Sequence, residues 1–299
     1  MAGAINGNLK PDWAKLLIAL YNNKMDIYLS GTNGRRWCIY DYMKIYMAGT
    51  MDGNQSHFIK KHYKNLMGCD ENKIDLAILE SFAYADEYIE KAIPLISDFL
   101  LDSGAYTYMA GKDGSEVNWE EYIERYANFI NKNKVERFIE LDIDSLVGYD
   151  EVKRLRKLLE SKTNKQPIVV WHKSRGKDEF LKMCDEYPYV AIGGLVTKEI
   201  KRTEYKVFPW FINEAHKRDA KIHGLGLTNI EAIKKYHFDS VDSSSWTAGN
   251  RFGHISKFTG NDIVYYTKPE GTRLKDSREV AENNFNEWVK FQRWAKNNL

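Results

Sequence analysis

The sequence predicts an α/β fold built as a single (β/α)8 TIM barrel. Short apolar runs alternate with segments of helical periodicity, a pattern typical of parallel βα units. Eight such runs can be counted, which is the number that closes this type of barrel. No repeat, low-complexity tract or linker interrupts the 299 residues, and the 6 prolines are scattered. We therefore expect one domain over 1–299.

The start of the chain is expected to add to the barrel rather than to belong to it. Residues 1–24 have the spacing of an N-terminal helical extension, and the first predicted strand is Asp26–Leu29. The stretch 31–75 that follows is too long for an ordinary loop. It is expected to hold a helical insertion, with helices around Cys38–Met47 and His57–Met67.

The remaining strands and helices alternate to the end of the barrel. The strands are expected at Leu76–Phe82, Phe99–Asp102, Arg137–Asp144, Pro167–His172, Tyr189–Val196, Lys221–Leu225 and Phe238–Asp242. The helices are expected at Trp119–Asn133, Asp150–Ser161, Lys177–Tyr187, Phe208–Arg218 and Asn229–Tyr236. A closing helix over Ser277–Asn298, within 276–299, should pack across the outside of the barrel.

Composition excludes several classes of protein. A hydrophobic fraction of 43%, a charged fraction of 29% and an aromatic fraction of 13% are typical of a globular protein with a core. Cys38, Cys69 and Cys184 lack the spacing of a disulfide framework or a zinc site, which favours a cytoplasmic protein. No secretory or membrane-spanning segment is evident. The net charge of +2 does not by itself indicate a nucleic-acid partner.

Acidic side chains end three of the predicted strands, where such a barrel carries its active site. Asp102 ends the third strand, Asp142 and Asp144 end the fourth, and Asp239 and Asp242 belong to the eighth. We therefore expect several carboxylates at one mouth. The alternative is that these acids cap the following helices, a role as common for any single Asp but less expected for three strand ends together.

The two-residue period of a strand separates acids that face the barrel interior from acids that face the helices. Ile139, Leu141 and Ile143 are expected to face the helices, which leaves Asp142 and Asp144 on the barrel side.

The same period applies to the eighth strand, where Asp239 and Asp242 have opposite parity, so only one can point inward. Asp242 is nearer the carboxyl end of the strand and is favoured, with Asp239 as the alternative.

Glycines, basic residues and aromatic residues also gather in the loops of this mouth. The basic residues are Arg35, Arg36, Lys173, Arg175, Lys177, Lys198, Lys201, Arg202 and Arg251. The aromatic residues are Trp37, Tyr106, Tyr108, Trp171 and Trp246. Glycines let a flat ligand approach the backbone, basic residues bind phosphates and aromatic rings stack on bases. Tight turns, solvated surface and core packing are the alternative roles. His172 and His223 end strands, but no histidine has metal-ligand spacing, so we expect no metal site.

Several motifs resemble those of the tRNA-guanine transglycosylase superfamily, in the same order over about 25–253. They are Asp102-Ser-Gly-Ala-Tyr106, Leu141-Asp142, Ile192-Gly-Gly-Leu195, Gly224-Leu-Gly226, and an acid followed nine residues later by Arg251-Phe-Gly253. The segments Ile78-Leu-Glu-Ser-Phe82, Leu101-Asp-Ser-Gly-Ala-Tyr106 and Ser240-Val-Asp-Ser-Ser-Ser-Trp246 resemble more closely the DNA-guanine transglycosylases of bacteriophages and bacterial modification clusters.

This resemblance implies a reaction in which guanine in DNA is exchanged for a 7-deazaguanine such as 7-cyano-7-deazaguanine. Asp242 would be the nucleophile that attacks the sugar C1′ and forms a glycosyl ester, and Asp102 the general acid/base on the purine nitrogens. The spacing of nine to Arg251 again selects Asp242, and the roles pass to Asp239 if its segment is the matching one.

The resemblance also implies which residues bind the substrates. Asp142, helped by Asp144, would accept hydrogen bonds from the purine, and the backbone of Gly193 and Gly194 would bind its other edge. The other base-binding residues would be Ser103, Gly104 and Tyr106, His172 at the base carbonyl, Leu195, His223 opposite Tyr106, and Gly224. The DNA backbone would meet Arg35, Arg36, Lys173, Arg175 and Arg251.

One departure from the superfamily concerns the nucleic-acid acceptor. The tRNA enzymes carry a C-terminal zinc site of three cysteines and a histidine, and nothing after Cys184 supplies it. We therefore expect DNA, as a flipped or single-stranded guanine, with no cofactor, no membrane partner and other proteins of a modification complex as possible partners. The alternatives are a tRNA-guanine transglycosylase, a barrel glycoside hydrolase, and a nucleobase-binding protein without activity.

Overall fold

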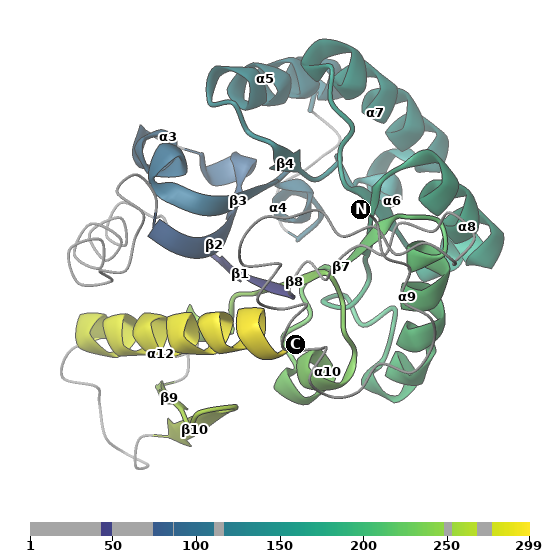
Figure 1. The fold of residues 1–299 in the computed structure, drawn as a ribbon. Coiled ribbons are helices and arrows are strands. Elements are labelled where there is room, and N and C mark those ends of the chain that lie inside the picture. Colours follow the sequence, from purple (N-terminus) through teal and green to yellow (C-terminus); the bar gives the residue numbers. More distant parts are fainter. Residues whose placement is uncertain (1–42, 50–73, 86, 111–116, 248–252, 268–276) are drawn as a thin grey trace, which may run out of the picture. The chain divides into compact units, whose positions relative to one another are not determined.

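The computed structural model describes residues 43–49, 74–85, 87–110, 117–247, 253–267 and 277–299 (Figure 1). By internal contacts the chain divides into Met1–Asp41 and Tyr42–Leu299, and all described residues belong to the second unit. The predicted extension 1–24, strand Asp26–Leu29 and helix His57–Met67 lie outside the described residues. The expectation of one domain over the whole chain stays a prediction.

Eight parallel strands form the sheet of the barrel, in the order β4-β3-β2-β1-β8-β7-β6-β5. They are β1 (Lys44–Ala48), β2 (Ile74–Ser81), β3 (Ile96–Asp102), β4 (Arg137–Phe138), β5 (Val169–Trp171), β6 (Tyr189–Ile192), β7 (Lys221–Gly224) and β8 (Ser240–Ser243). The two ends of this order meet at a parallel bridge between Ile139 and Ile168. There the Ile168 N–H donates to the Phe138 carbonyl at 2.8 Å and the Glu140 N–H to the Ile168 carbonyl at 3.0 Å. The predicted (β/α)8 fold is confirmed.

Helices follow the strands and lie around the sheet (Figure 1). They are α3 (Glu87–Ala92), α4 (Ala105–Ala110), α5 (Trp119–Lys132), α6 (Asp144–Val147), α7 (Tyr149–Thr163), α8 (Gly176–Glu186), α9 (Phe208–His216), α10 (Ile230–Lys235) and α12 (Ser277–Asn298). In α5, Asn118 caps the first turn by accepting the Glu121 N–H, and Tyr122 and Tyr126 lie four residues apart on the buried face. The predicted helices from Trp119 onward agree with these bounds to within about two residues.

The core has two layers because side chains alternate between the faces of each strand. The larger layer lies between strands and helices and includes Ile78, Leu101 and Val241. The inner layer fills the barrel with Tyr46, Ala77, Leu79, Leu100, Ile139, Ile168, Val170 and Ala191. Near the carboxyl ends of the strands, side chains on the same face as this inner layer therefore point to the mouth of the barrel.

Helix α12 covers the outside of the barrel beside β1, as predicted (Figure 1). Its buried Gln292 donates to the carbonyls of Ile45 and Ala77 and accepts the Ala77 N–H at 3.1 Å. This amide bridges β1 and β2 at the point where the register of β2 shifts.

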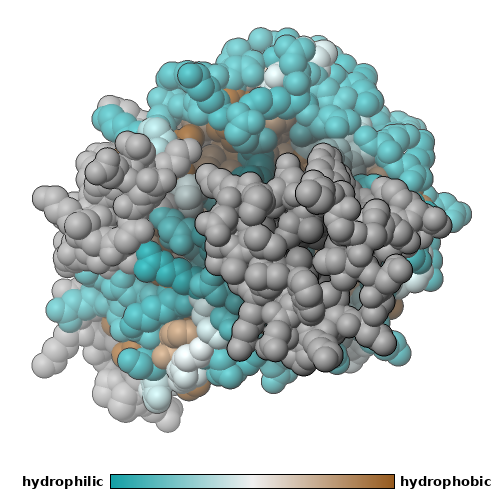
Figure 2. All heavy atoms as spheres, viewed as in Figure 1, coloured by the Kyte–Doolittle hydropathy of each residue, from teal (hydrophilic) through white to brown (hydrophobic). Residues whose placement is uncertain are grey.

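A two-stranded hairpin, β9 (His254–Phe258) and β10 (Ile263–Thr267), follows the barrel and was not predicted. Its outer strand exposes Val264, Tyr265 and Tyr266. On the face shown in Figure 2 the described surface is mainly hydrophilic, with hydrophobic residues in small separate patches. Among the helices of the described ranges, none has the length and hydropathy that crossing a membrane requires.

Two expectations about the strands are wrong. The segment Cys38–Met47 was expected to be helical, yet β1 occupies Lys44–Ala48 and pairs with both β2 and β8. Ile139 was expected to face the helices, but it packs in the inner layer, and Glu140 faces the helices instead. The strand pairing ends there, and the Ile143 N–H turns back to the Leu141 carbonyl at 3.1 Å, so the two-residue period does not continue through 137–144.

Candidate active site

Asp102 and Asp242 lie at the carboxyl ends of β3 and β8 and face the same mouth of the barrel. Burial raises the pKa of Asp102 from 3.8 to about 6, against the hydrogen bond that its Oδ2 accepts from the Gly104 N–H at 2.9 Å. The negative charges of Asp242 and Asp142 contribute smaller parts of the same rise. Near neutral pH, Asp102 can therefore both give and take a proton.

Asp242 is held by two donors on one oxygen. Its Oδ1 accepts the Gly226 N–H at 2.5 Å and lies 3.2 Å from His223 Nε2. Among the described residues, no hydrogen bond is made to Oδ2. Asp239 points the other way, because its Oδ2 accepts from His216 of α9 at 2.9 Å and from the Ile222 N–H at 2.7 Å. The parity argument that favoured Asp242 over Asp239 is thus confirmed by the geometry.

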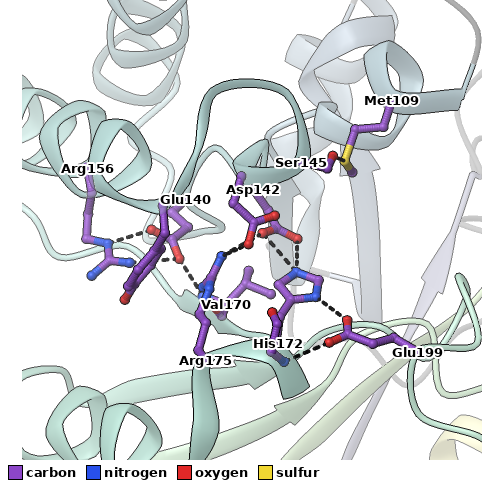
Figure 3. Close-up of polar contacts among 12 residues, drawn as sticks. Met109, Glu140, Asp142, Ser145, Arg156, Val170, His172, Arg175 and Glu199 are labelled. Carbon is purple, nitrogen blue, oxygen red and sulfur yellow. Dashed lines mark hydrogen bonds and ion pairs between the residues drawn. The ribbon is translucent and has the colours of Figure 1, made fainter.

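His172, at the end of β5, bridges two carboxylates (Figure 3). Its Nε2 lies 2.8 Å from Asp142 Oδ2, and its Nδ1 lies 2.8 Å from Glu199 Oε2. Burial alone would lower the pKa of His172, but the hydrogen bond and charge of Asp142, with the hydrogen bond of Glu199, raise it to about 9. His172 is therefore an imidazolium at neutral pH, and both of its nitrogens donate.

Arg175 offsets part of the remaining negative charge at this side of the mouth. Its guanidinium lies 2.8 Å from Asp144 and 3.6 Å from Asp142, donates to the Val170 carbonyl, and stacks 4.1 Å from the Tyr149 ring centroid. The side chain is only 4% exposed. The expectation that Arg175 contacts a DNA backbone is corrected: the guanidinium is buried and already paired with carboxylates.

Three glycines leave room for these side chains. Gly104, at φ +81, turns the chain after Asp102, and a Cβ there would lie 2.6 Å from the Cβ of Ala83. A Cβ on Gly193 would lie 2.8 Å from the His172 ring, and one on Gly194 would lie 2.6 Å from Glu199. Gly193 and Gly194 were expected to make room for a ligand, but the space beside them is occupied by the side chains of His172 and Glu199.

Other predicted base-binding residues differ in what they present to the mouth. Tyr106 on α4 is 55% exposed and is free to stack on a planar ligand. His223 is fully buried below Asp242, which corrects the expectation that its ring pairs with Tyr106 around a base. Ser103 and Leu195 are buried as well, so their side chains are not exposed to a ligand. Gly224, also buried, ends β7 against Leu227 and Val241.

Of the other predicted nucleic-acid contacts, Lys173 is exposed and pairs with Glu204 at 2.6 Å. Arg35, Arg36 and Arg251 lie outside the described residues.

A possible cation site coincides with this cluster. One ligand atom from each of Asp142, Asp144 and His172 lies within 4.8 Å of the others. A divalent ion there would have to displace the Arg175 guanidinium and the proton of His172, both of which already neutralise the two carboxylates. These donors therefore fit a metal ion poorly, and no step is assigned to one.

The sequence analysis missed several residues that shape the site. Glu199 follows the Gly193–Gly194 turn in a loop without strand or helix periodicity, and only its distance from His172 identifies it. Glu140 is completely buried, pairs with Arg156 of α7 at 2.5 Å and accepts the Val170 N–H at 2.6 Å (Figure 3). The Glu140 carboxylate thus links the chain that follows β4 both to β5 and to α7.

Comparison with known proteins gives a limited result. No family profile and no curated protein matches the chain. Three similar solved structures are an aldolase called QR15 and two from Coccidioides immitis, described as a deoxyribose-phosphate aldolase and a fructose-1,6-biphosphate aldolase. Their identities are 11%, 11% and 13% and their TM-scores 0.45, 0.43 and 0.44. They cover 70%, 79% and 86% of this chain, and the matches span 93%, 95% and 88% of theirs. A likeness of this strength says nothing about activity or substrate.

Proposed function

We propose that this protein is a base-exchanging pentosyltransferase that replaces guanine in DNA with a 7-deazaguanine. The observation that carries the proposal is the pair of carboxylates at the mouth. Asp102 has a pKa near 6, suited to proton transfer, while Asp242 is oriented through Oδ1 and keeps Oδ2 free of donors from the described residues. One group suits proton transfer and the other suits covalent attack.

In the first step, Asp242 Oδ2 forms a bond to C1′ of the nucleotide while the bond from C1′ to the purine nitrogen breaks. Asp102, in its protonated form, gives its proton to the departing guanine. A carboxylate suits this attack because it stabilises the oxocarbenium-like transition state before bonding to it. The product is a glycosyl ester on Asp242 and free guanine.

In the second step, ionised Asp102 takes the proton from the ring nitrogen of the incoming deazaguanine. That nitrogen bonds to C1′, and the ester bond breaks with its electron pair returning to Asp242. Both carboxyl groups end in their starting protonation states, so the cycle needs no cofactor.

The opposite side of the mouth has the polarity that guanine requires. Asp142 and Asp144 provide acceptor oxygens for purine N–H groups. Both N–H groups of the His172 imidazolium donate to Asp142 and Glu199, so His172 orients Asp142 and does not contact the base carbonyl as the resemblance implied. Tyr106 adds an exposed ring for stacking. The choice of DNA and of a 7-deazaguanine rests on the sequence motifs, and Lys173, which is exposed and paired with Glu204, is one basic residue of the described ranges that could contact a phosphate.

The test uses the full chain and DNA that carries radiolabelled guanine, as single strands and as duplex, with unlabelled 7-cyano-7-deazaguanine as the incoming base. We expect the wild type to release more than one equivalent of label per protein chain only when the incoming base is present. Asp242→Asn should abolish release. Asp239→Asn is the matched control, because it makes the same chemical change at a carboxylate just before β8 that faces His216 and the Ile222 N–H. Mass spectrometry of a reaction without incoming base should detect a DNA adduct on Asp242.

Three outcomes contradict the proposal. Release of more than one equivalent of base per protein chain without an incoming purine would indicate a glycoside hydrolase. Binding of a deazaguanine with no turnover on any polynucleotide would indicate a binding protein. Exchange on tRNA but not on DNA would change the acceptor.

A further inference from the structure

A relay of hydrogen-bonded side chains, formed by Asp242, His223, Ser240 and Tyr189, runs from the mouth into the barrel. Asp242 Oδ1 lies 3.2 Å from His223 Nε2, and His223 Nδ1 lies 2.5 Å from Ser240 Oγ. Ser240 Oγ in turn lies 2.5 Å from Tyr189 Oη. The four residues belong to the neighbouring strands β6, β7 and β8, and both His223 and Ser240 are completely inaccessible to solvent.

The donor and acceptor capacities of these groups fix the direction of the chain. An ionised Asp242 can only accept, so the proton between it and His223 belongs to Nε2. Tyr189 and Ser240 each have one hydroxyl proton. If Ser240 gave its proton to Tyr189, the tyrosine hydroxyl would have no acceptor among the described residues. Every group is satisfied when Tyr189 donates to Ser240, Ser240 donates to His223 Nδ1, and Nε2–H donates to Asp242.

We infer that Tyr189, Ser240 and His223 are positioning residues that hold His223 as the Nε2–H tautomer and thereby fix the orientation of Asp242. This inference rests on the proposed function for its catalytic consequence. With Oδ1 bound by His223 and Gly226, rotation of the carboxylate is blocked and Oδ2 is the oxygen that attacks C1′. When the ester breaks in the second step, the same two donors stabilise the negative charge that returns to Asp242.

A second buried tyrosine provides a matched control. Tyr46 lies in the same inner layer, with its ring centroid 6.2 Å from that of His223. Its hydroxyl donates to Asp98 at 2.6 Å and takes no part in the relay. Tyr46→Phe and Tyr189→Phe therefore remove the same group from the same core, and only Tyr189→Phe interrupts the chain to Asp242.

The test combines nitrogen-15 NMR of the histidine side chains with base-exchange kinetics. In the wild type we expect the His223 signals of an Nε2–H tautomer. Ser240→Ala should produce a mixture of tautomers and lower kcat by about 10- to 100-fold, the cost typical of removing a partner that orients a catalytic ligand, with little change in KM. Tyr189→Phe should shift the same signals, whereas Tyr46→Phe should leave them unchanged.

The two readouts separate failure of the relay from failure of the proposed function. An Nδ1–H tautomer in the wild type, or a Ser240→Ala protein with wild-type signals and wild-type kcat, overturns the relay. A wild type that exchanges no base overturns the proposed function, while the NMR signals still decide whether the relay exists.

Discussion

The raised pKa of Asp102 predicts that removing this carboxylate stabilises the protein. Moving the pKa of a carboxyl from 3.8 to about 6 costs the ionised folded state about 3 kcal/mol relative to the unfolded chain. The stability associated with neutral Asp102 is fully present below pH 3.8 and is lost as the pH rises through about 6. Asp102→Asn keeps the shape of the side chain and cannot ionise. It should therefore be more stable than the wild type at pH 7.5, and nearly equal to it at pH 4.

The size of the effect is large enough for thermal unfolding to detect. For a unit of this size, about 3 kcal/mol corresponds to an increase in Tm of about 5 °C at pH 7.5. Differential scanning fluorimetry of both proteins between pH 4 and pH 8 gives the difference in Tm at each pH. Asp178→Asn, on the exposed first turn of α8, is the control and should change stability by less than about 1 kcal/mol at every pH.

Two results would refute this reasoning. If Asp102→Asn has the same Tm as the wild type at pH 7.5, burial does not penalise the ionised carboxylate. If the gain in Tm is equal at pH 4 and pH 7.5, it does not come from ionisation. A gain at neutral pH together with loss of base exchange is the pattern expected when stability is sacrificed for catalysis.

Three further predictions concern the surroundings of the two carboxylates. The pKa of His172 is raised from 6.5 to about 9, so its imidazolium adds stability that is fully present below pH 6.5 and is lost as the pH rises through 9. Glu199→Gln should lower this pKa in an NMR titration, and an unchanged pKa would contradict the role of Glu199. Glu140→Gln leaves the Arg156 charge buried without a counterion, so denaturant unfolding should show a loss of about 3 to 5 kcal/mol, and a loss below about 1 kcal/mol would show that the pair does not support the fold. Gly104→Ala places a Cβ at a positive φ against neighbouring backbone and should cost more than about 1 kcal/mol, which a Tm equal to that of the wild type would exclude.

Much of the barrel could be predicted because parallel βα units have a distinctive pattern. The misplaced first strand has a physical explanation. Ile45, Tyr46 and Met47 are all buried, since one face of β1 meets the inner layer and the other meets α12. A strand buried on both faces shows a continuous apolar run without alternation, and such a run is easily taken for part of a helix.

The candidate site was predictable where side chains keep the strand period and not where the chain leaves it. Asp102 and Asp242 were found because both lie within regular strands. Asp142 was placed at the mouth by assuming that the two-residue period of a strand continues from Arg137 to Asp144. The same assumption gave the wrong face for Ile139, because β4 ends at Phe138. Glu199, in a loop, left no signal in the sequence, because pairing across the mouth depends on spatial proximity and not on spacing.

The pairing of Ser240 with Tyr189 and His223 was also beyond the sequence. Seryl hydroxyls are common at strand ends, and their partners are set by the neighbouring strands rather than by local pattern.

The seam between β4 and β5 gives this barrel a mechanical property. Backbone pairing across the seam consists of a single bridge, and the Glu140 carboxylate supplies a further bond to β5. Asp142 and His172 lie on opposite sides of that seam, and the hydrogen bond between their side chains also links the two sides. A ligand that competes for Asp142 or His172 should weaken this link between β4 and β5, and a ligand that contacts both residues should strengthen it. We therefore expect the closure of the barrel at this seam and the affinity for such a ligand to be thermodynamically coupled.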